Sequence, residues 1–305
     1  MVSAVTLEGV SKTYDDFHAV RDVSFEVPAG RITGFLGPNG AGKTSTLRMI
    51  LGLLPPTAGR ISVLGALDAT RVRERIGFLP EERGLYKRMT PIDAIAFSAG
   101  LKGVPESEGR KRAVALLEAQ GLGFAMRRPI KDLSKGMAQK VQLLSALAHE
   151  PELVVLDEPF SGLDPVNQQA LETMIREIAA RGATVLFSTH VMQHAERLCD
   201  KVVLMARGRK VFDGDVATAR SAAPRALVLE GELTADEVAA LPGLGEVASE
   251  ALHEGGWRHV ARLPQVGTGQ DALKAAFARD LSLRRFELKE PSLHDAFIVL
   301  TGGQA

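Results

Sequence analysis

The sequence has almost no cysteine, the residue whose disulfides stabilise small secreted proteins, and it has no excess charge of either sign. Among its 305 residues there is one cysteine, Cys199, so no disulfide can form within the chain. This is typical of a protein in a reducing compartment. Lysine and arginine total 37, as do aspartate and glutamate, so the formal net charge is zero. The balance excludes a general attraction to nucleic acid or anionic lipid and leaves room only for a local patch.

Long hydrophobic runs are also missing. No stretch approaches the ~18 apolar residues needed to cross a bilayer, and residues 1–8 lack the basic region and apolar core of a signal peptide. We therefore expect any role at a membrane to need a separate membrane-embedded partner. The hydrophobic fraction of 45% and charged fraction of 24% are those of a globular protein. The length suggests about two domains.

One strong motif is present, Gly-Pro-Asn-Gly-Ala-Gly-Lys-Thr at residues 37–44. It fits the phosphate-binding pattern G-x-x-x-x-G-K-[ST]. Residues 31–36 predict a buried strand before it and residues 44–51 a helix after it, which is the context the pattern requires. The residues expected around the phosphates are Gly37, Pro38, Asn39, Gly40, Ala41, Gly42, Lys43, Thr44 and Ser45.

The chemistry of the motif follows from its residue types. Glycines let successive N–H groups turn inward without a Cβ clash, and the helix N-terminus adds the positive end of a dipole. Lys43 can bridge the outer phosphates, and the Thr44 hydroxyl can ligate Mg²⁺. The alternative is a glycine-rich turn with a chance lysine, which arises in roughly one 300-residue chain in a hundred. The predicted strand and helix on either side make such a chance match rarer, so we interpret residues 37–44 as a nucleoside-triphosphate site.

Polar residues follow two further buried strands. Asp157 and Glu158 come directly after residues 153–156, and His190 comes two residues after the strand at 184–188. The carboxyl ends of strands are where α/β sheets place ligand chemistry. Asp157 can hold Mg²⁺, Glu158 can orient and deprotonate a water, and His190 can hydrogen-bond a terminal phosphate. Acidic pairs often simply start loops, and isolated histidines are often filler, but these positions favour a functional role.

Two predicted helices begin at residues that can cap them. Ser134 precedes a helix with apolar-periodic residues at 141–147, and Asp164, followed by a proline, opens another. A serine hydroxyl and free N–H groups at a helix start form an anion site, while plain capping explains the serine equally well. The residues alone leave both interpretations of Ser134 open.

Tyr14 precedes the phosphate loop in a predicted polar turn between two strands. It could stack on a nucleotide base, an interaction worth roughly 1–3 kcal/mol at nucleic-acid sites. A plain tyrosine at the edge of a sheet is the alternative, and the spacing favours neither.

The order of predicted elements indicates two regions. Up to about residue 220, buried strands alternate with helices, and a helical subdomain (about 90–150) interrupts them. From 221 to 305 the order is β-α-β-β-α-β and a final helix from Pro291, which suggests a small split βαβ domain without a catalytic constellation. The apolar stripe of that helix must be buried, with a second protomer as one candidate surface. The stripe consists of Leu293, Ala296, Phe297 and Leu300.

Taken together, residues 3–220 resemble the ATP-binding cassette of ABC transporters. Six motifs occur in the order of that family. They are Tyr14 for the aromatic that stacks on adenine, residues 37–44 for Walker A, Ser134 and Gly136 for the signature, residues 153–158 for Walker B with its catalytic glutamate, residues 161–164 for the D-loop with Asp164, and His190 for the switch histidine. The region 221–305 resembles the accessory domain of some bacterial export-type cassettes.

The resemblance implies an α/β fold of the P-loop NTPase class. We expect a cassette at 1–220, with a RecA-like core, an antiparallel β subdomain and a helical subdomain, and a small α+β domain at 221–305. It implies an ATPase with ATP and Mg²⁺ as cofactors. The implied catalytic residues are Glu158, His190 and Lys43, and the implied metal ligands are Thr44, Asp157 and Glu81.

Two positions depart from the family pattern. The signature usually reads Leu-Ser-Gly-Gly-Gln, and here Lys135 and Met137 replace two of its residues. The serine that contacts the γ-phosphate is kept, so ATP sandwiching is still expected. The loop after residues 78–80 normally supplies a glutamine to Mg²⁺ and here offers Glu81, with Glu82 as the alternative.

The resemblance also implies partners. In the family, the phosphate loop of one cassette and the signature of another clamp the same ATP. This chain has one of each, so we expect a homodimer with two equivalent sites. We expect integral-membrane transporter subunits as further partners, no nucleic acid, and a location on the cytoplasmic face of the cell membrane. Loop 81–90 and the helices after it are the implied docking surface for the membrane partner.

Three classes of function remain for comparison. The favoured one is the ATPase subunit of an ABC exporter. A soluble cassette ATPase acting on nucleic acid or ribosomes is the alternative. Such relatives usually carry two cassettes in one chain or a long coiled-coil insertion, and neither appears in this sequence. A nucleotide kinase or GTPase would leave the signature and His190 unexplained, and the guanine motif Asn-Lys-x-Asp is absent.

Overall fold

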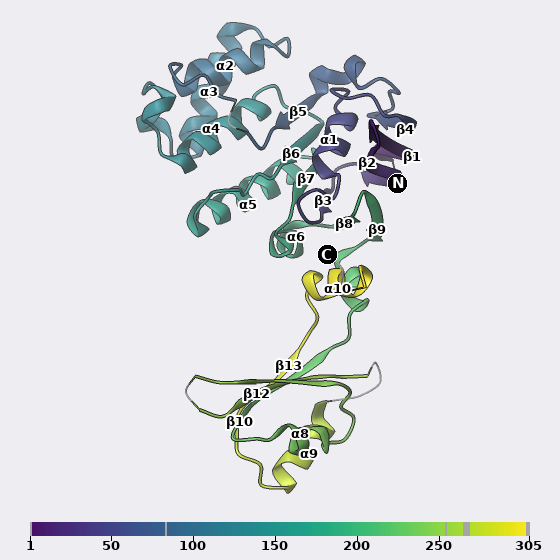
Figure 1. Ribbon diagram of the computed structural model, residues 1–305. Helices are drawn as coiled ribbons and strands as arrows, with labels where there is room; N and C mark the ends of the chain where they lie inside the picture. Colours follow the sequence, from purple (N-terminus) through teal and green to yellow (C-terminus); the bar gives the residue numbers. More distant parts are fainter. Residues whose placement is uncertain (1, 83, 254, 265–268, 303–305) are drawn as a thin grey trace. The chain divides into compact units, whose positions relative to one another are not determined.

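The computed structural model describes residues 2–82, 84–253, 255–264 and 269–302. The chain divides into two units, one ending at Val216 and the other beginning at Ala217 (Figure 1). The sequence placed its predicted boundary after residue 220, four residues further along. Each unit has its own sheet and its own hydrophobic cluster, so each is described by itself.

A six-stranded sheet forms the centre of the first unit. It is parallel except for its last strand, which pairs antiparallel with its neighbour. The inner strands are apolar and buried, as expected for a parallel sheet covered on both faces. In spatial order the strands are β5 (Ile76–Leu79), β6 (Leu153–Asp157), β7 (Thr184–Thr189), β3 (Ile32–Leu36), β8 (Lys201–Ala206) and β9 (Arg209–Gly214).

The register of this sheet determines where the site lies. Asp157 at the end of β6 pairs with Ser188 of β7, and Leu36 at the end of β3 pairs with Thr189. Because these strands are parallel and adjacent, their carboxyl ends meet at one edge of the sheet. The residues that follow them are therefore brought together.

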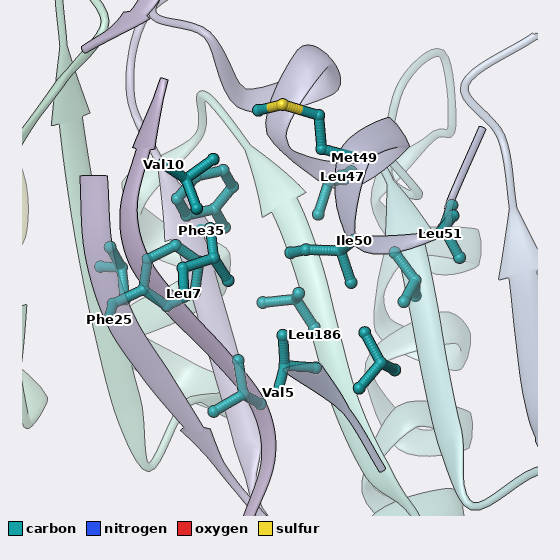
Figure 2. Close-up of a cluster of buried hydrophobic side chains, with 14 of the residues drawn as sticks. Val5, Leu7, Val10, Phe25, Phe35, Leu47, Met49, Ile50, Leu51 and Leu186 are labelled. Carbon is teal, nitrogen blue, oxygen red and sulfur yellow. The ribbon is translucent and has the colours of Figure 1, made fainter. Parts of the chain in front are cut away.

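A second, antiparallel sheet lies against the same core. It consists of β2 (Phe17–Pro28), β1 (Ser3–Tyr14) and β4 (Ala58–Val63). Figure 2 shows side chains from β1, β2, β3, β7 and α1 (Lys43–Ile50) facing one another. Phe25 and Phe35 meet here with ring centroids 5.3 Å apart. Each fully buried side chain of this size contributes roughly 1.5–3 kcal/mol, so this cluster anchors the helix behind the phosphate loop.

Three helices form the predicted helical subdomain: α2 (Pro91–Gly100), α3 (Glu106–Ala119) and α4 (Lys135–Leu147). They lie side by side in Figure 1, with short 3₁₀ turns at Gly123–Ala125 and Ile130–Asp132. Thr90 caps α2 by accepting from the N–H of Asp93 at 3.2 Å. The Asp93 carboxylate in turn accepts from the Thr90 hydroxyl at 2.6 Å.

The remaining elements of the first unit are α5 (Pro165–Ala180), α6 (Met192–Leu198) and a 3₁₀ helix at Ala69–Arg75. Asp164 caps α5 with Pro165 at its first position, as predicted. The sequence did not predict α6, which begins two residues after His190. This short helix therefore fixes the chain directly behind the expected switch histidine.

The second unit has the predicted β-α-β-β-α-β order. Its antiparallel sheet has the spatial order β11-β12-β10-β13, so the first and third strands lie at the centre, as in a split βαβ fold. Its hydrophobic cluster includes Leu227, Leu229 and Ala261 of the sheet and Val238 and Ala272 of two helices. The elements are α7 (Val216–Ser221), which begins at the unit boundary, β10 (Ala226–Gly231), α8 (Ala235–Ala239), β11 (Val247–Ala251), β12 (Trp257–Arg262), α9 (Gly269–Ala278) and β13 (Leu283–Lys289).

The final helix, α10 (Leu293–Leu300), corrects two predictions. It starts at Leu293 and not at Pro291, because Ser292 is its N-cap and forms a capping box with Asp295. Three of the four residues of its apolar stripe are covered by the chain itself, since Leu293, Ala296 and Phe297 are 0–3% exposed, while Leu300 is half-buried. These three buried residues are therefore not free to meet a second protomer.

The other face of the second sheet carries a row of alternating charges. Glu250, Arg258, Glu230 and Arg285 occupy directly opposed positions on β11, β12, β10 and β13. Consecutive members form ion pairs at 3.0, 3.5 and 3.4 Å. Pairs of opposite charge on neighbouring strands stabilise a sheet by roughly 0.2–1 kcal/mol each.

Candidate active site

The phosphate loop is held in place by contacts that only glycine permits. Gly37 has φ +154°, and a Cβ there would collide with the carbonyl oxygen of Met205 in β8. Gly42 has φ +98°, and its Cβ would lie 2.6 Å from the carbonyl oxygen of Ala19 in β2. A Cβ at Gly40, by contrast, would meet no atom of the described residues within 4 Å. The loop is therefore pressed against β8 and β2 at its ends and open at its tip.

A cavity of about 360 Å³ lies over this loop. Its size is within the range of small-molecule sites. Its lining unites the loop, the first turn of α1, the β1–β2 hairpin and the segments after β5 and β6. The lining residues are Phe17, Ala19, Asn39, Gly40, Gly42, Lys43, Thr44, Ser45, Glu81 and Glu158.

Lys43 is buried among the polar and charged groups of the site. Its ammonium donates to the carbonyl oxygens of Gly37 at 2.7 Å and Pro38 at 3.2 Å. It also lies 3.5 Å from a carboxylate oxygen of Glu158. Because both side chains are largely withdrawn from water, this ion pair is screened little by salt.

Asp157 and Thr44 approach each other at the edge of the sheet. The Thr44 hydroxyl donates to Oδ1 of Asp157 at 3.4 Å, and the same oxygen accepts from the Ser188 hydroxyl at 2.5 Å. The second buried carboxylate at this edge of the sheet is Glu158. Its Oε1, the oxygen 3.5 Å from the Lys43 ammonium, has no hydrogen-bond partner among the described residues. Hydroxyl, carboxylate and phosphate oxygens are the ligands of Mg²⁺, which needs only one or two carboxylates beside a nucleotide. These residues therefore fit a Mg²⁺-nucleotide.

Glu158 is positioned by its backbone and by His190. Its φ of +46° lies in the left-handed region, which is uncommon for a residue with a side chain. Its second oxygen, Oε2, lies 3.1 Å from Nδ1 of His190. His190 is half-exposed while Glu158 is buried. The pair thus presents a buried carboxylate and an accessible imidazole on the same side of the sheet edge.

The structure distinguishes Glu81 from Glu82. Glu81 lines the cavity over the phosphate loop, and Glu82 is not among the lining residues. The carbonyl oxygen of Glu82 instead accepts from the side-chain amide of Gln142 in α4 at 3.2 Å. A second amide of α4, on Gln139, donates to the carbonyl oxygen of Pro159 at 3.1 Å. Helix α4 is therefore tied to both segments that carry acidic residues of the site.

Tyr14 and Phe17 face each other across the β1–β2 hairpin, where they form the last pair of the register. Phe17 lines the cavity and is 64% exposed. Tyr14 is not among the lining residues, and the ammonium of Lys12 lies 5.2 Å from its ring centroid. The hairpin therefore offers two exposed aromatic rings near the phosphate loop.

Ser134, Gly136 and Asp164 form a separate group. Ser134 accepts from the N–H of Met137 at 3.3 Å and so caps α4. A Cβ at Gly136 would touch the side chain of Asn167, which itself donates to Asp164 at 2.6 Å. The starts of α4 and α5 are therefore packed against each other. None of these residues lines the cavity over the phosphate loop.

The sequence prediction missed three residues around the site. Phe17 and Ala19 line the cavity, and Ser188 bonds to Asp157. The signal for Ser188 was its position in a buried strand otherwise made of apolar residues and threonine, where a serine needs a partner. Phe17 was recognisable only as an aromatic residue in the same turn as Tyr14.

The parallel sheet, the phosphate loop and the acidic strand ends define a P-loop NTPase, and the helical and antiparallel subdomains place it in the ATP-binding cassette class. Residues 20–161 match the family model described as ABC transporter. The chain is 37% identical to the uncharacterized ABC transporter ATP-binding protein YhaQ of Bacillus subtilis (strain 168), over 98% of both chains. The protein belongs to the ABC transporter ATP-binding proteins, and it is an ABC transporter ATPase.

Other similar proteins agree with this assignment. The chain is 36% identical to the Nod factor export ATP-binding protein I of Rhizobium leguminosarum bv. viciae, over 69% of each chain. A solved structure of the ATP-binding subunit of an ABC transporter has 34% sequence identity and a TM-score of 0.66, covering 72% of this chain and 92% of that one. A subunit of this kind is part of a transporter complex with membrane subunits. Within the described residues, no helix is long and apolar enough to cross a membrane.

Proposed function

We propose that this chain powers export across a membrane by binding and hydrolysing ATP with Mg²⁺. The observation that carries the proposal is the convergence of Lys43, Thr44, Asp157, Glu158 and His190 at the carboxyl edge of one sheet. The similarity to an ATP-binding protein named for Nod factor export supports the direction of transport.

Each residue has a distinct role in this proposal. Lys43 neutralises the outer phosphates, and Glu158 accepts a proton from the attacking water, oriented by its bond to His190. His190 donates to the terminal phosphate. Asp157 and Thr44 would hold Mg²⁺, with Glu81 as a third oxygen ligand, and the ion when bound spreads the charge of the outer phosphates.

The rest of the nucleotide is recognised by the loop and the hairpin. Residues 37–45 surround the phosphates. The first turn of α1 contributes backbone N–H groups, because the N–H groups at a helix start have no partners inside the helix. Tyr14 stacks on the adenine, and the position of Phe17 in the cavity makes it a second candidate for that contact.

A second copy of the chain completes the site. Ser134, Gly136 and Asp164 lie together but away from the cavity that contains Lys43. If they contact nucleotide, they contact one bound by another cassette. A two-fold homodimer places the phosphate loop of each copy against the signature residues of the other and leaves no site unpaired.

Apolar side chains near loop 81–90 are proposed to receive the membrane subunits on the cytoplasmic face of the membrane. Tyr86 and Phe97 pack edge to face with centroids 6.1 Å apart, yet they are 64% and 45% exposed. Leu101, at the end of the same helix, is also exposed. Exposed aromatic residues of this kind are enriched in protein interfaces.

The domain division is part of the same proposal. The cassette, residues 1–220, contains every proposed catalytic and binding residue. The domain at 221–305 is proposed as an accessory that acts on stability or control of the assembly, because its charged sheet face and covered final helix provide no catalytic group.

The substitution Glu158→Gln tests the hydrolytic assignment. It should lower steady-state ATP turnover by roughly 10²–10⁴-fold, because a positioned general base is removed. ATP binding should persist, and the dimer should accumulate with ATP in light-scattering measurements. Glu150→Gln, at an exposed glutamate outside the site, is the matched control. Turnover of Glu158→Gln equal to that of the control would exclude Glu158 as the base.

A further inference from the structure

Ser188 connects the two acidic residues of the site. It lies in β7, it is fully buried, and it pairs directly with Asp157 of β6. Its hydroxyl donates to Oδ1 of Asp157 at 2.5 Å. The same hydroxyl oxygen accepts from the backbone N–H of Glu158 at 3.0 Å. One side chain thus contacts both the carboxylate of Asp157 and the backbone of Glu158.

The contact with Glu158 concerns its backbone conformation. The φ of +46° at Glu158 is costly for a residue with a Cβ, and such conformations persist where the surroundings determine them. The N–H of Glu158 is shared by the hydroxyl and the carbonyl oxygen of Ser188, the latter at 3.2 Å. Without the hydroxyl, that N–H would keep only the weaker, longer bond.

The contact with Asp157 concerns the direction of its carboxylate. Oδ1 accepts from Ser188 at 2.5 Å and from Thr44 at 3.4 Å, so the Ser188 bond is the shorter of the two. A hydrogen bond to an ionised group in a buried setting is among the stronger ones in proteins. Loss of the Ser188 hydroxyl would leave Thr44 alone to hold this oxygen.

We propose that Ser188 is a positioning residue that sets both the orientation of Asp157 towards Mg²⁺ and the left-handed backbone of Glu158. This inference rests on the proposed function of the site. Ser188 touches neither nucleotide nor metal in this proposal. It acts through its two neighbours, and its loss affects metal binding and turnover together.

Ser188→Ala tests the proposal, with Thr33→Val as the matched control. Thr33 lies in β3, next to β7, and is also fully buried, but its hydroxyl has no hydrogen-bond partner among the described residues. Both substitutions therefore remove one buried hydroxyl from neighbouring strands. The measurements are the steady-state kcat for ATP, the affinity of the protein–ATP complex for Mn²⁺ by electron paramagnetic resonance, and binding of fluorescent ATP without metal.

For Ser188→Ala we expect kcat and Mn²⁺ affinity each to fall by about tenfold or more, the effect of a hydrogen bond to a charged group. Binding of fluorescent ATP without metal should change less than twofold. Thr33→Val should match the wild type. A kcat and Mn²⁺ affinity of Ser188→Ala within twofold of the wild type would overturn the proposal, as would equal losses in Thr33→Val.

Two further variants keep the proposal testable if Ser188→Ala does not fold, and separate it from the proposed function. If Ser188→Ala does not fold, Ser188→Cys carries the test, because a thiol is similar in size but a weak donor. It should show smaller losses of the same two quantities, and wild-type values would overturn the proposal. Glu158→Gln is measured in parallel. Full turnover in that variant refutes the function proposed for the site, whereas an inactive Glu158→Gln beside a normal Ser188→Ala refutes only the role of Ser188.

Discussion

A buried pair behind the active site, Glu172 of α5 and His194 of α6, should be a determinant of the stability of the first unit. Nδ1 of His194 lies 3.0 Å from Oε1 of Glu172, and both side chains are 6% exposed. The ring of Phe160, two residues after Glu158, is stacked on His194 at a centroid distance of 3.9 Å. Arg197 approaches the same carboxylate oxygen at 3.6 Å from the surface. The pair therefore links α5, α6 and the segment that follows the proposed base.

Leucine substitutions at these two positions should change the free energy of unfolding by three different amounts. His194→Leu leaves a buried carboxylate with only Arg197 and should lower the free energy of unfolding by about 3–5 kcal/mol. Glu172→Leu leaves a buried imidazole without its partner and should cost about 1–3 kcal/mol. The double variant replaces a buried polar pair by an apolar pair and should lie within about 1 kcal/mol of the wild type. The single effects should thus fail to add.

The second unit can serve as an internal reference when the unfolding of the first unit is measured. Its one tryptophan, Trp257, lies in β12 of the second unit. Tryptophan fluorescence therefore follows the second unit, while far-UV circular dichroism also follows the first. His194→Leu should lower the main thermal transition by roughly 6–20 °C, at 2–4 °C per kcal/mol for a domain of this size, and leave the Trp257 transition unchanged.

Turnover provides the functional readout. Because α6 begins two residues after His190, loosening it should also lower the ATPase rate of His194→Leu, with recovery in the double variant. Additive single effects, or a loss below about 1 kcal/mol for His194→Leu, would refute the reasoning that this pair is a coupled buried unit.

Three further predictions follow from the site and its surroundings. Glu81→Gln removes a negative charge from the cavity, so the midpoint of the Mg²⁺ titration of ATPase activity should move to higher concentration, and superimposable curves would place Glu81 away from the metal. Replacing both Tyr14 and Phe17 by alanine should weaken ATP binding by roughly 5–150-fold, equivalent to 1–3 kcal/mol of stacking, and leave tripolyphosphate binding unchanged; equal losses for both ligands would exclude stacking. Burial, and then the carboxylate of Asp200, raises the pKa of the Cys199 thiol well above its usual value. Alkylation of Cys199 at pH 8 should therefore be more than about tenfold slower in the folded protein than after unfolding.

The sequence predicts the site well where polar residues directly follow the ends of buried strands. Glycine pattern and hydrophobic runs indicated the loop, the strands and the polar residues after them, and parallel pairing then brings Thr44, Asp157 and Glu158 together without further information. The order of the second unit was also predictable, because its strands alternate clearly and its turns contain glycine.

What could not be predicted depends on register and on packing between distant segments. Ser188 acquires its role only because β7 pairs with β6 so that it faces Asp157, a registration that the strand pattern does not specify. The burial of Leu293 and its neighbours depends on what the chain places against α10. Helix α6 was missed because seven residues are too few for a clear helical period.

The charged row on the second sheet has a consequence for any assembly of two chains. In a homodimer the two C-terminal sheets would be tethered at high local concentration. The outer edges of β11 and β13, which pair with no further strand among the described residues, would then invite the sheets to fuse. Both edges carry charges, with Glu250 on one and Arg285 on the other, and four of the seven residues of β13 are ionised. Joining two copies of the same edge would strip water from these charged side chains. In the proposed homodimer, these charges would keep the two C-terminal sheets distinct while the cassettes meet and separate.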